Sequence, residues 1–143
     1  MQSRVINQQG RIWFLVLANG EDVMPALRRF AEEHGIEGAT FTGLGAFEDS
    51  VVSWFNWETK EYEPVQAHGQ AEVLSIVGSI SLGLDGKQMV HAHAVLGRPN
   101  GSVVGGHILE AKVRPTLEVT LVESAEALKR KTDAETGLAL LAL

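Results

Sequence analysis

The sequence predicts an α+β fold in which one main helix packs on a mostly antiparallel β-sheet. An apolar run at Ile12–Ala18 has the length of a strand, and Asn19-Gly20 ends it. Helical periodicity follows. From Ala39 onward the chain consists of short apolar or alternating runs separated by turn residues, as in antiparallel sheets. We expect a strand, a helix, a series of strands and a short C-terminal helix.

The first strand and the helix are the best-defined elements. The uninterrupted apolar run 12–18 predicts a strand that is covered on both faces. Glu21 and Asp22 come next, where a carboxylate can cap the free N–H groups of a first helical turn. An apolar stripe between residues 23 and 31 and the glycine at Gly35 predict a helix that ends there.

The rest of the chain is predicted to be β-structure almost to its end. Pro115 separates the last two expected strands, and Ser124-Ala125-Glu126 can begin a short helix. The apolar segment 137–143 should pack against the sheet or against a neighbouring subunit. The expected strands are 40–42, 51–55, 61–65, 72–80, 89–96, 102–113 and 116–122.

Composition narrows the function classes. A length of 143 residues suits a single domain, 1–143, and the absence of cysteine excludes disulfides, thiolate metal sites and cysteine nucleophiles. No apolar segment has the length of a signal peptide or a membrane span, so we expect a cytoplasmic protein without a membrane partner. The net charge of −6 argues against DNA binding. We interpret Arg28-Arg29 and 129–131 as solvated helix faces, with a local basic patch as the alternative.

Three histidines form the main candidate site. His91 and His93 are two apart in a predicted strand, so both side chains point to one face of the sheet. A short loop then returns the chain so that His107 lies opposite His93, where cross-strand Cβ atoms are ~5 Å apart. Three imidazoles with an open fourth position match a zinc site. We expect His93, between the other two, to be the most sensitive ligand, and Gly105-Gly106 to allow a bulge that aims His107.

Other polar residues leave alternatives open. Glu72, Glu110 or a water could complete the metal shell, and Glu118 is a further acidic candidate. His34 and His68 are expected to lie outside the site, at a helix end and in a loop or at a strand edge. The simpler interpretation of the three candidate histidines is a set of hydrogen-bonded side chains on a sheet face.

Several motifs and their order along the chain resemble one family, the PPC domain (plant and prokaryote conserved, also called PCC). The resemblance is to the stand-alone prokaryotic type, which is related to the C-terminal domain of plant AT-hook nuclear-localised proteins. It is strongest over residues 11–122. The motifs are Gly20–Val23, Gly43–Phe47, Glu72–Ile80, His91–His93 and Val104–His107.

The resemblance implies a homotrimer with a mostly antiparallel sheet, and a metal ion in at least some prokaryotic members. We therefore expect a protein that binds a divalent metal, with a possible small-molecule or hydrolytic role and with enzymatic activity left open. The alternative implied by the family is a DNA-binding or transcription-associated regulator. The AT-hook core Arg-Gly-Arg-Pro is absent, because Gly97-Arg98-Pro99 lacks the first arginine.

Overall fold

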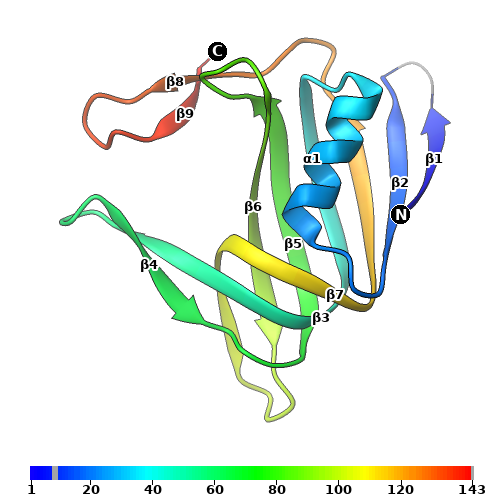
Figure 1. Cartoon of the computed structure of the whole chain (residues 1–143), viewed down its shortest axis with the longest axis vertical. Coiled ribbons are helices and arrows are strands. Elements are labelled where there is room, and N and C mark those ends of the chain that lie inside the picture. Colours follow the sequence, from blue (N-terminus) through cyan, green and yellow to red (C-terminus); the bar gives the residue numbers. More distant parts are fainter. Residues whose placement is uncertain (8–9, 143) are drawn as a thin grey trace.

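A computed structural model describes residues 1–7 and 10–142 of the chain (Figure 1). Most of the described residues lie in strands, and the described part contains one helix. The sheet has the order β1-β2-β7-β3-β5-β8-β9, with β4 paired to β3 and β6 paired to β5 and β7. The elements are β1 (Gln2–Asn7), β2 (Ile12–Ala18), α1 (Val23–His34), β3 (Gly38–Asn56), β4 (Glu61–Gln66), β5 (Ala71–Leu82), β6 (Gln88–Gly97), β7 (Val103–Glu123), β8 (Lys129–Thr132) and β9 (Ala139–Ala142).

Two long strands close the centre of the sheet on itself. β3 pairs with β5, β5 with β6, β6 with β7, and β7 with β3, so the four strands form a closed cycle of antiparallel ladders. Glycines allow the close approach of these strands. A Cβ at Gly43 would lie 2.5 Å from the Glu118 carbonyl oxygen, and one at Gly78 would lie 2.5 Å from that of His91. The backbone of β6 is therefore fixed from both sides.

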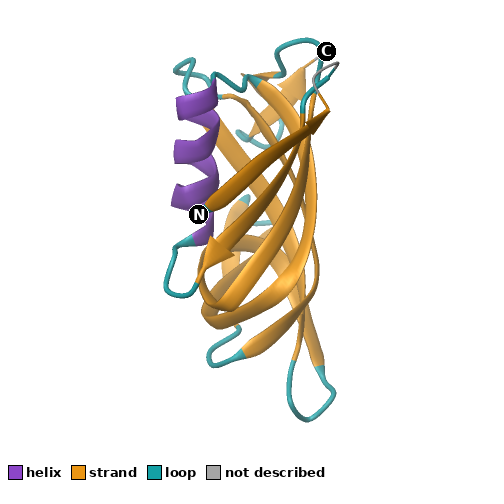
Figure 2. Cartoon of the chain, turned by 90° about the vertical axis from the view of Figure 1, so that its right-hand side faces the viewer, coloured by secondary structure: helices purple, strands orange, loops and turns teal. Residues whose placement is uncertain are grey.

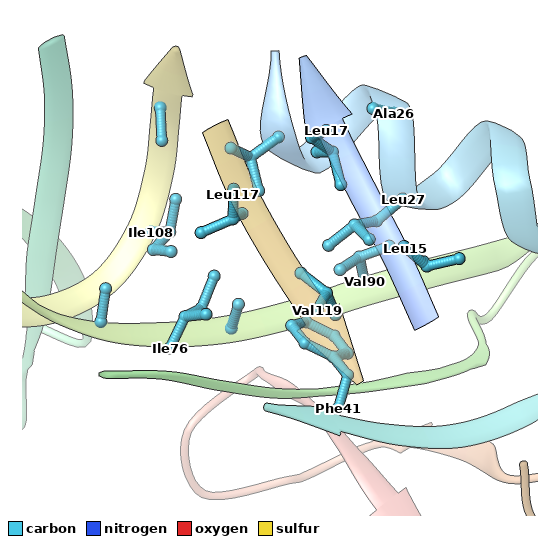
Figure 3. Close-up of a cluster of buried hydrophobic side chains, with 14 of the residues drawn as sticks. Leu15, Leu17, Ala26, Leu27, Phe41, Ile76, Val90, Ile108, Leu117 and Val119 are labelled. Atoms are coloured by element: carbon cyan, nitrogen blue, oxygen red, sulfur yellow. The ribbon is translucent and has the colours of Figure 1, made fainter. Parts of the chain in front are cut away.

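The helix covers one face of this curved sheet, as Figure 2 shows from the side. α1 packs against β6 and β7, and its buried side chains meet Leu15 and Leu17 of β2 and Val90 of β6 (Figure 3). Gly35 ends the helix in the left-handed conformation, with φ of 63°, as the sequence predicts. The expected side-chain cap is absent: Asp22 occupies the N-cap position without such a hydrogen bond.

The prediction of an α+β fold with a C-terminal helix was wrong. The chain is mostly β, and the segment expected to begin a second helix at Ser124 leads instead into the β8–β9 hairpin. β8 is held by a parallel bridge between Leu82 and Lys129 and by the buried side chain of Arg130. Strand pairing thus outweighs the local capping signal. Lys129–Thr132 is also a strand rather than the solvated helix face that we expected.

Two further predictions about strands need correction. β2 buries one face only, and Phe14 is 39% exposed, because the opposite face of the sheet carries no covering layer within the described residues. The strands predicted at 40–42 and 51–55 are one strand, and so are those on either side of Pro115. Glycine and proline here fit inside bent strands rather than ending them.

Two hairpins project from the same side of the molecule, away from α1: the β3–β4 hairpin and the β8–β9 hairpin (Figure 1). β6 lies between their bases in this view. The one helix of the described chain, α1, has 12 residues and is too short to span a membrane.

Candidate metal centre

Strand β6 presents two of the three candidate histidines on one face of the sheet. Val90, Ala92 and Ala94 point into the core, and the alternate residues His91 and His93 point away from it. Apolar residues at every second position of β6 therefore fix the direction of both imidazoles. The strand and the shared face agree with the prediction from the His-Ala-His spacing.

The third histidine comes from β7 in the predicted register. His93 is the direct partner of His107, and Val95 is that of Gly105. The β6–β7 ladder is regular at the two glycines, so the expected bulge is absent there. Gly106 instead permits close packing, since a Cβ at this position would lie 2.4 Å from the carbonyl oxygen of Ser53. The irregularity nearest His107 lies one to three residues later, in the β3–β7 ladder.

The three imidazoles converge. Their candidate ligand atoms all lie within 4.8 Å of one another, and the Nε2 atoms of His91 and His107 are 2.6 Å apart. The ring centroid of His107 lies 4.4 Å from that of His91 and 4.1 Å from that of His93, whereas the latter two are 5.2 Å apart. His107, rather than His93 as we expected, is the central member of the cluster.

The donor set suits a first-row divalent cation. Imidazole nitrogens about 2.0–2.1 Å from a tetrahedral zinc ion are ~3.3 Å from one another. The separation of 2.6 Å between two Nε2 atoms and the 4.8 Å limit for the set lie on either side of that value. Small side-chain rotations would therefore let all three nitrogens share one ion.

The surroundings favour the neutral imidazoles that a metal requires. Burial lowers the pKa of His107 to about 4, and the charges of His93 and His91 act in the same direction. Burial also lowers the pKa of His91, followed by the positive charge of Arg130. Two members of the cluster thus keep their lone pairs at pH values where an ordinary histidine is protonated.

Two residues near the cluster were missed by sequence reasoning. The hydroxyl of Tyr62 lies 3.2 Å from Nε2 of His107, and its strand β4 was predicted without any role for this residue. Arg130 is only 9% exposed, and its charge affects both His91 and His107. A lone arginine between two lysines gave no signal of burial. If residues 129–132 had been recognised as a strand, the alternation of side chains between its two faces would have indicated that Arg130 points away from the side of Lys129 and Lys131.

A cavity of about 340 Å³ adjoins the histidines. His91 and His107 line it on one side, Tyr62 lies beside His107, and Arg130 comes from the C-terminal hairpin. Its walls are otherwise mainly apolar. The apolar lining includes Met24, Phe55, Met89, Leu109, Leu138 and Leu140.

The acidic candidates do not join the cluster. Among the described residues the candidate group contains histidines alone. Glu110 lines a separate depression with Asp49, and Glu72 lies opposite Gly97, four residues beyond His93 on β6. Glu118 is exposed on β7.

The remaining two histidines lie outside the site, as expected. His34 ends α1, with its Nδ1 atom 2.9 Å from the carbonyl oxygen of Phe30. His68 is largely exposed and its Nδ1 atom lies 3.4 Å from a carboxylate oxygen of Asp49.

The sequence profile of the Plants and Prokaryotes Conserved (PCC) domain matches residues 4–125. The chain belongs to this family. The match includes all three histidines and ends before β8, so Arg130 lies beyond the matched segment. A search of curated proteins found no match.

Solved structures share the fold over nearly the whole chain. A plant- and prokaryote-conserved protein of Pyrococcus horikoshii is 33% identical, with a TM-score of 0.87 over 99% of this chain and 95% of that one. A metal-containing protein of Archaeoglobus fulgidus is 34% identical, with a TM-score of 0.86 over 99% and 97%. A candidate DNA-binding protein of Ralstonia eutropha is 25% identical, with a TM-score of 0.87 over 97% and 95%.

Proposed function

We propose that this PCC-domain protein binds one divalent metal ion, zinc, through His91, His93 and His107. The observation that carries the proposal is the convergence of three imidazoles, with ligand atoms within 4.8 Å, on one face of the sheet. The metal-containing relative from Archaeoglobus fulgidus supports it, because that protein is 34% identical over nearly the whole chain.

Zinc is the ion that best fits the surroundings. Imidazole also suits copper, nickel and iron, so the ligands alone leave the metal open. The chain has no cysteine that could supply a thiolate ligand, and zinc needs no redox partner. Since no carboxylate of the described residues joins the histidines, the remaining position is left for water or an exogenous ligand. A metal-bound water can act as a nucleophile, which would suit a hydrolytic or small-molecule role.

Metal content tests the proposal. After dialysis against buffer and zinc loading, the wild-type chain should contain one zinc ion per subunit by elemental analysis. His107→Ala removes the central imidazole and should reduce zinc to background. His68→Ala, which removes an exposed histidine outside the cluster, is the matched control and should keep one ion. Equal zinc in His107→Ala and wild type would refute the site.

We also propose that the chain forms a homotrimer through the sheet face that α1 leaves uncovered. On this face, a row of residues that pair laterally from strand to strand runs across five strands and ends at the histidine cluster. The row consists of Phe14, Thr120, Thr42, Val77, His93 and His107. Large apolar side chains are exposed on the same strands, including Leu44, Leu74 and Val95. Exposed apolar side chains gathered on neighbouring strands are typical of subunit contacts.

Light scattering tests the assembly. We expect a mass about three times the 15.5 kDa of one chain at micromolar concentration. Leu44→Glu together with Val77→Glu places two charges on the apolar face and should shift the mass toward the monomer. Glu32→Gln on the solvent side of α1 is the control and should leave the mass unchanged. A monomeric wild type would contradict the trimer.

DNA binding is the alternative, and the relative from Ralstonia eutropha carries that description. The observations on this chain argue against it. The net charge is −6, and burial of Arg130 leaves only Lys129 and Lys131 of that basic run exposed. We expect weak binding to duplex DNA at physiological salt, measured by fluorescence anisotropy. Sub-micromolar affinity that falls steeply with salt would support the alternative.

A further inference from the structure

The guanidinium group of Arg130 is buried with one nitrogen unused. Its Nε donates to the Ser81 hydroxyl at 2.8 Å, and Nη1 donates to the Ala139 carbonyl oxygen at 2.6 Å. Nη2 is fully buried and has no hydrogen-bond partner among the described residues. An unpaired N–H of a buried cation is costly, and a bound anion would satisfy it.

No described carboxylate forms an ion pair with this arginine. The ion pairs within the described residues involve other cations, such as Arg11 with Glu123 and Arg114 with Glu48. The titratable groups that influence Arg130 or respond to it are Tyr62, His91 and His107, and none of them is a carboxylate. Within residues 1–7 and 10–142, no carboxylate therefore balances its buried positive charge.

The cavity next to Arg130 has a shape and lining for a small organic molecule. Its volume is about 340 Å³, with Arg130 and the histidines contributing polar groups to a lining that is otherwise mainly apolar. Phe55 and Tyr62 provide aromatic surface, since their ring centroids are 5.3 Å apart in an edge-to-face arrangement. A few polar groups among apolar walls are typical of small-ligand sites.

We infer that this cavity binds a small monocarboxylate with an apolar body, whose carboxylate pairs with the guanidinium group of Arg130 beside the histidine cluster. The apolar body lies between β6 and the β8–β9 hairpin, against Met89 and Leu140. The inference deepens the proposed function by naming a ligand class for the same site. It rests on that function only for the contact between ligand and metal.

The arginine end can be tested without metal. Phenylacetate is the probe, and phenylacetamide, nearly identical in shape but neutral, is its control. Isothermal titration calorimetry on chelator-treated protein should show binding of the acid at least about tenfold tighter than that of the amide, because a charge-assisted hydrogen bond is lost. Zinc loading should tighten acid binding further if the carboxylate also reaches the ion.

Variants locate the probe. Arg130→Gln should weaken acid binding about tenfold or more and abolish the preference over the amide. Since this change could unfold the C-terminal hairpin, Leu140→Trp is the second variant. It fills the cavity from a position that is 44% exposed, and should abolish binding. Leu141→Trp alters the next residue, 45% exposed and not part of the cavity lining, and should bind like wild type.

The outcomes separate the two proposals. Equal binding of acid and amide, binding that survives Leu140→Trp, or no binding to either form of the wild type would overturn the inference. The last result is also expected if a neighbouring subunit fills the cavity. If the acid binds through Arg130 but the protein holds no zinc, the metal proposal fails and this inference stands. If the protein binds zinc but not the acid, this inference fails and the metal proposal stands.

Discussion

Two of the hairpins that line the cavity, β6–β7 and β8–β9, are held in different ways. The β6–β7 hairpin, with the three histidines, belongs to the closed cycle of strands and is paired on both sides. The β8–β9 hairpin has strands of four residues each. Within the described chain, one bridge from Leu82 to Lys129 pairs it with the sheet, and Arg130 donates a hydrogen bond to Ser81 of β5. The three candidate metal ligands therefore lie on strands that are paired on both sides, and Arg130 lies on a small accessory hairpin.

The largest effect is expected from changing the packing of the β6–β7 hairpin. In Gly106→Ala the new methyl group would lie 2.4 Å from the backbone oxygen of Ser53, which three paired strands hold in place. We expect the free energy of unfolding to fall by about 3 kcal/mol, measured by urea denaturation. Gly97→Ala is the control, because its nearest neighbour is the exposed Leu74 side chain at 3.2 Å, which can rotate away. Similar stability of the two variants would show that the hairpin is less constrained than described.

Metal removal should have the next largest effect. An ion bound at the proposed site would join β6 to β7 and stabilise the folded state by mass action, by about 2.7 kcal/mol when free zinc is 100 times the dissociation constant. Chelation should therefore lower the melting temperature of the wild type, measured by calorimetry. The His107→Ala variant should respond to neither chelator nor zinc. A chelator effect of equal size in this variant would place the metal elsewhere.

The metal-free protein should lose stability as the pH falls from about 6.5 to 4. The pKa of His107 is about 4 in the folded chain and near 6.5 when unfolded, so between these values the unfolded state binds more protons. Stability from this group is thus fully present above pH 6.5 and is lost on acidification. We expect a loss on the order of 1 kcal/mol, because partial exposure screens the shift.

Denaturant unfolding at pH 7 and pH 5 measures this loss. Carboxylates with lowered pKa values, such as Glu21, contribute to acid destabilisation as well. The difference between wild type and His107→Gln isolates the histidine. If the two chains lose stability in parallel over this range, the imidazole is not buried as the structure has it.

The smallest effects are expected on the exposed side of the β8–β9 hairpin. Lys129 and Lys131 flank Arg130 but point to solvent, so Lys129→Gln and Lys131→Gln should change stability by less than about 0.5 kcal/mol. Arg130→Gln should be clearly more damaging, because it removes two hydrogen bonds from a buried group. Thermal melts of the three variants compare them directly. Equal effects would mean that Arg130 is as solvated as its neighbours.

The difference between the hairpins also explains what the sequence could predict. The period of two residues in a strand and a short loop were sufficient to bring His91, His93 and His107 together, because both are local rules. The continuity of β3 and β7 was not predictable in this way. Gly45 and Pro115 are typical of strand ends, and only tertiary pairing keeps them inside bent strands.

The prediction of a C-terminal helix was wrong for a related reason. Ser124-Ala125-Glu126 resembles a helix start, but the segment that follows gains more by pairing with β5 and burying Arg130. Arg130 is buried through hydrogen bonds to Ser81, 49 residues earlier in the chain, and to Ala139, on the partner strand of its hairpin. Local propensity contains no information on such contacts.

Crystals of the zinc-loaded protein offer the most direct test of the central claim. Anomalous difference maps calculated from data on either side of the zinc absorption edge should show one peak per subunit, within bonding distance of the side chains of His91, His93 and His107, ~2.0–2.1 Å from each ligand nitrogen. We expect no described carboxylate in the first coordination sphere. A zinc peak elsewhere, or none between these imidazoles at full zinc loading, would contradict it.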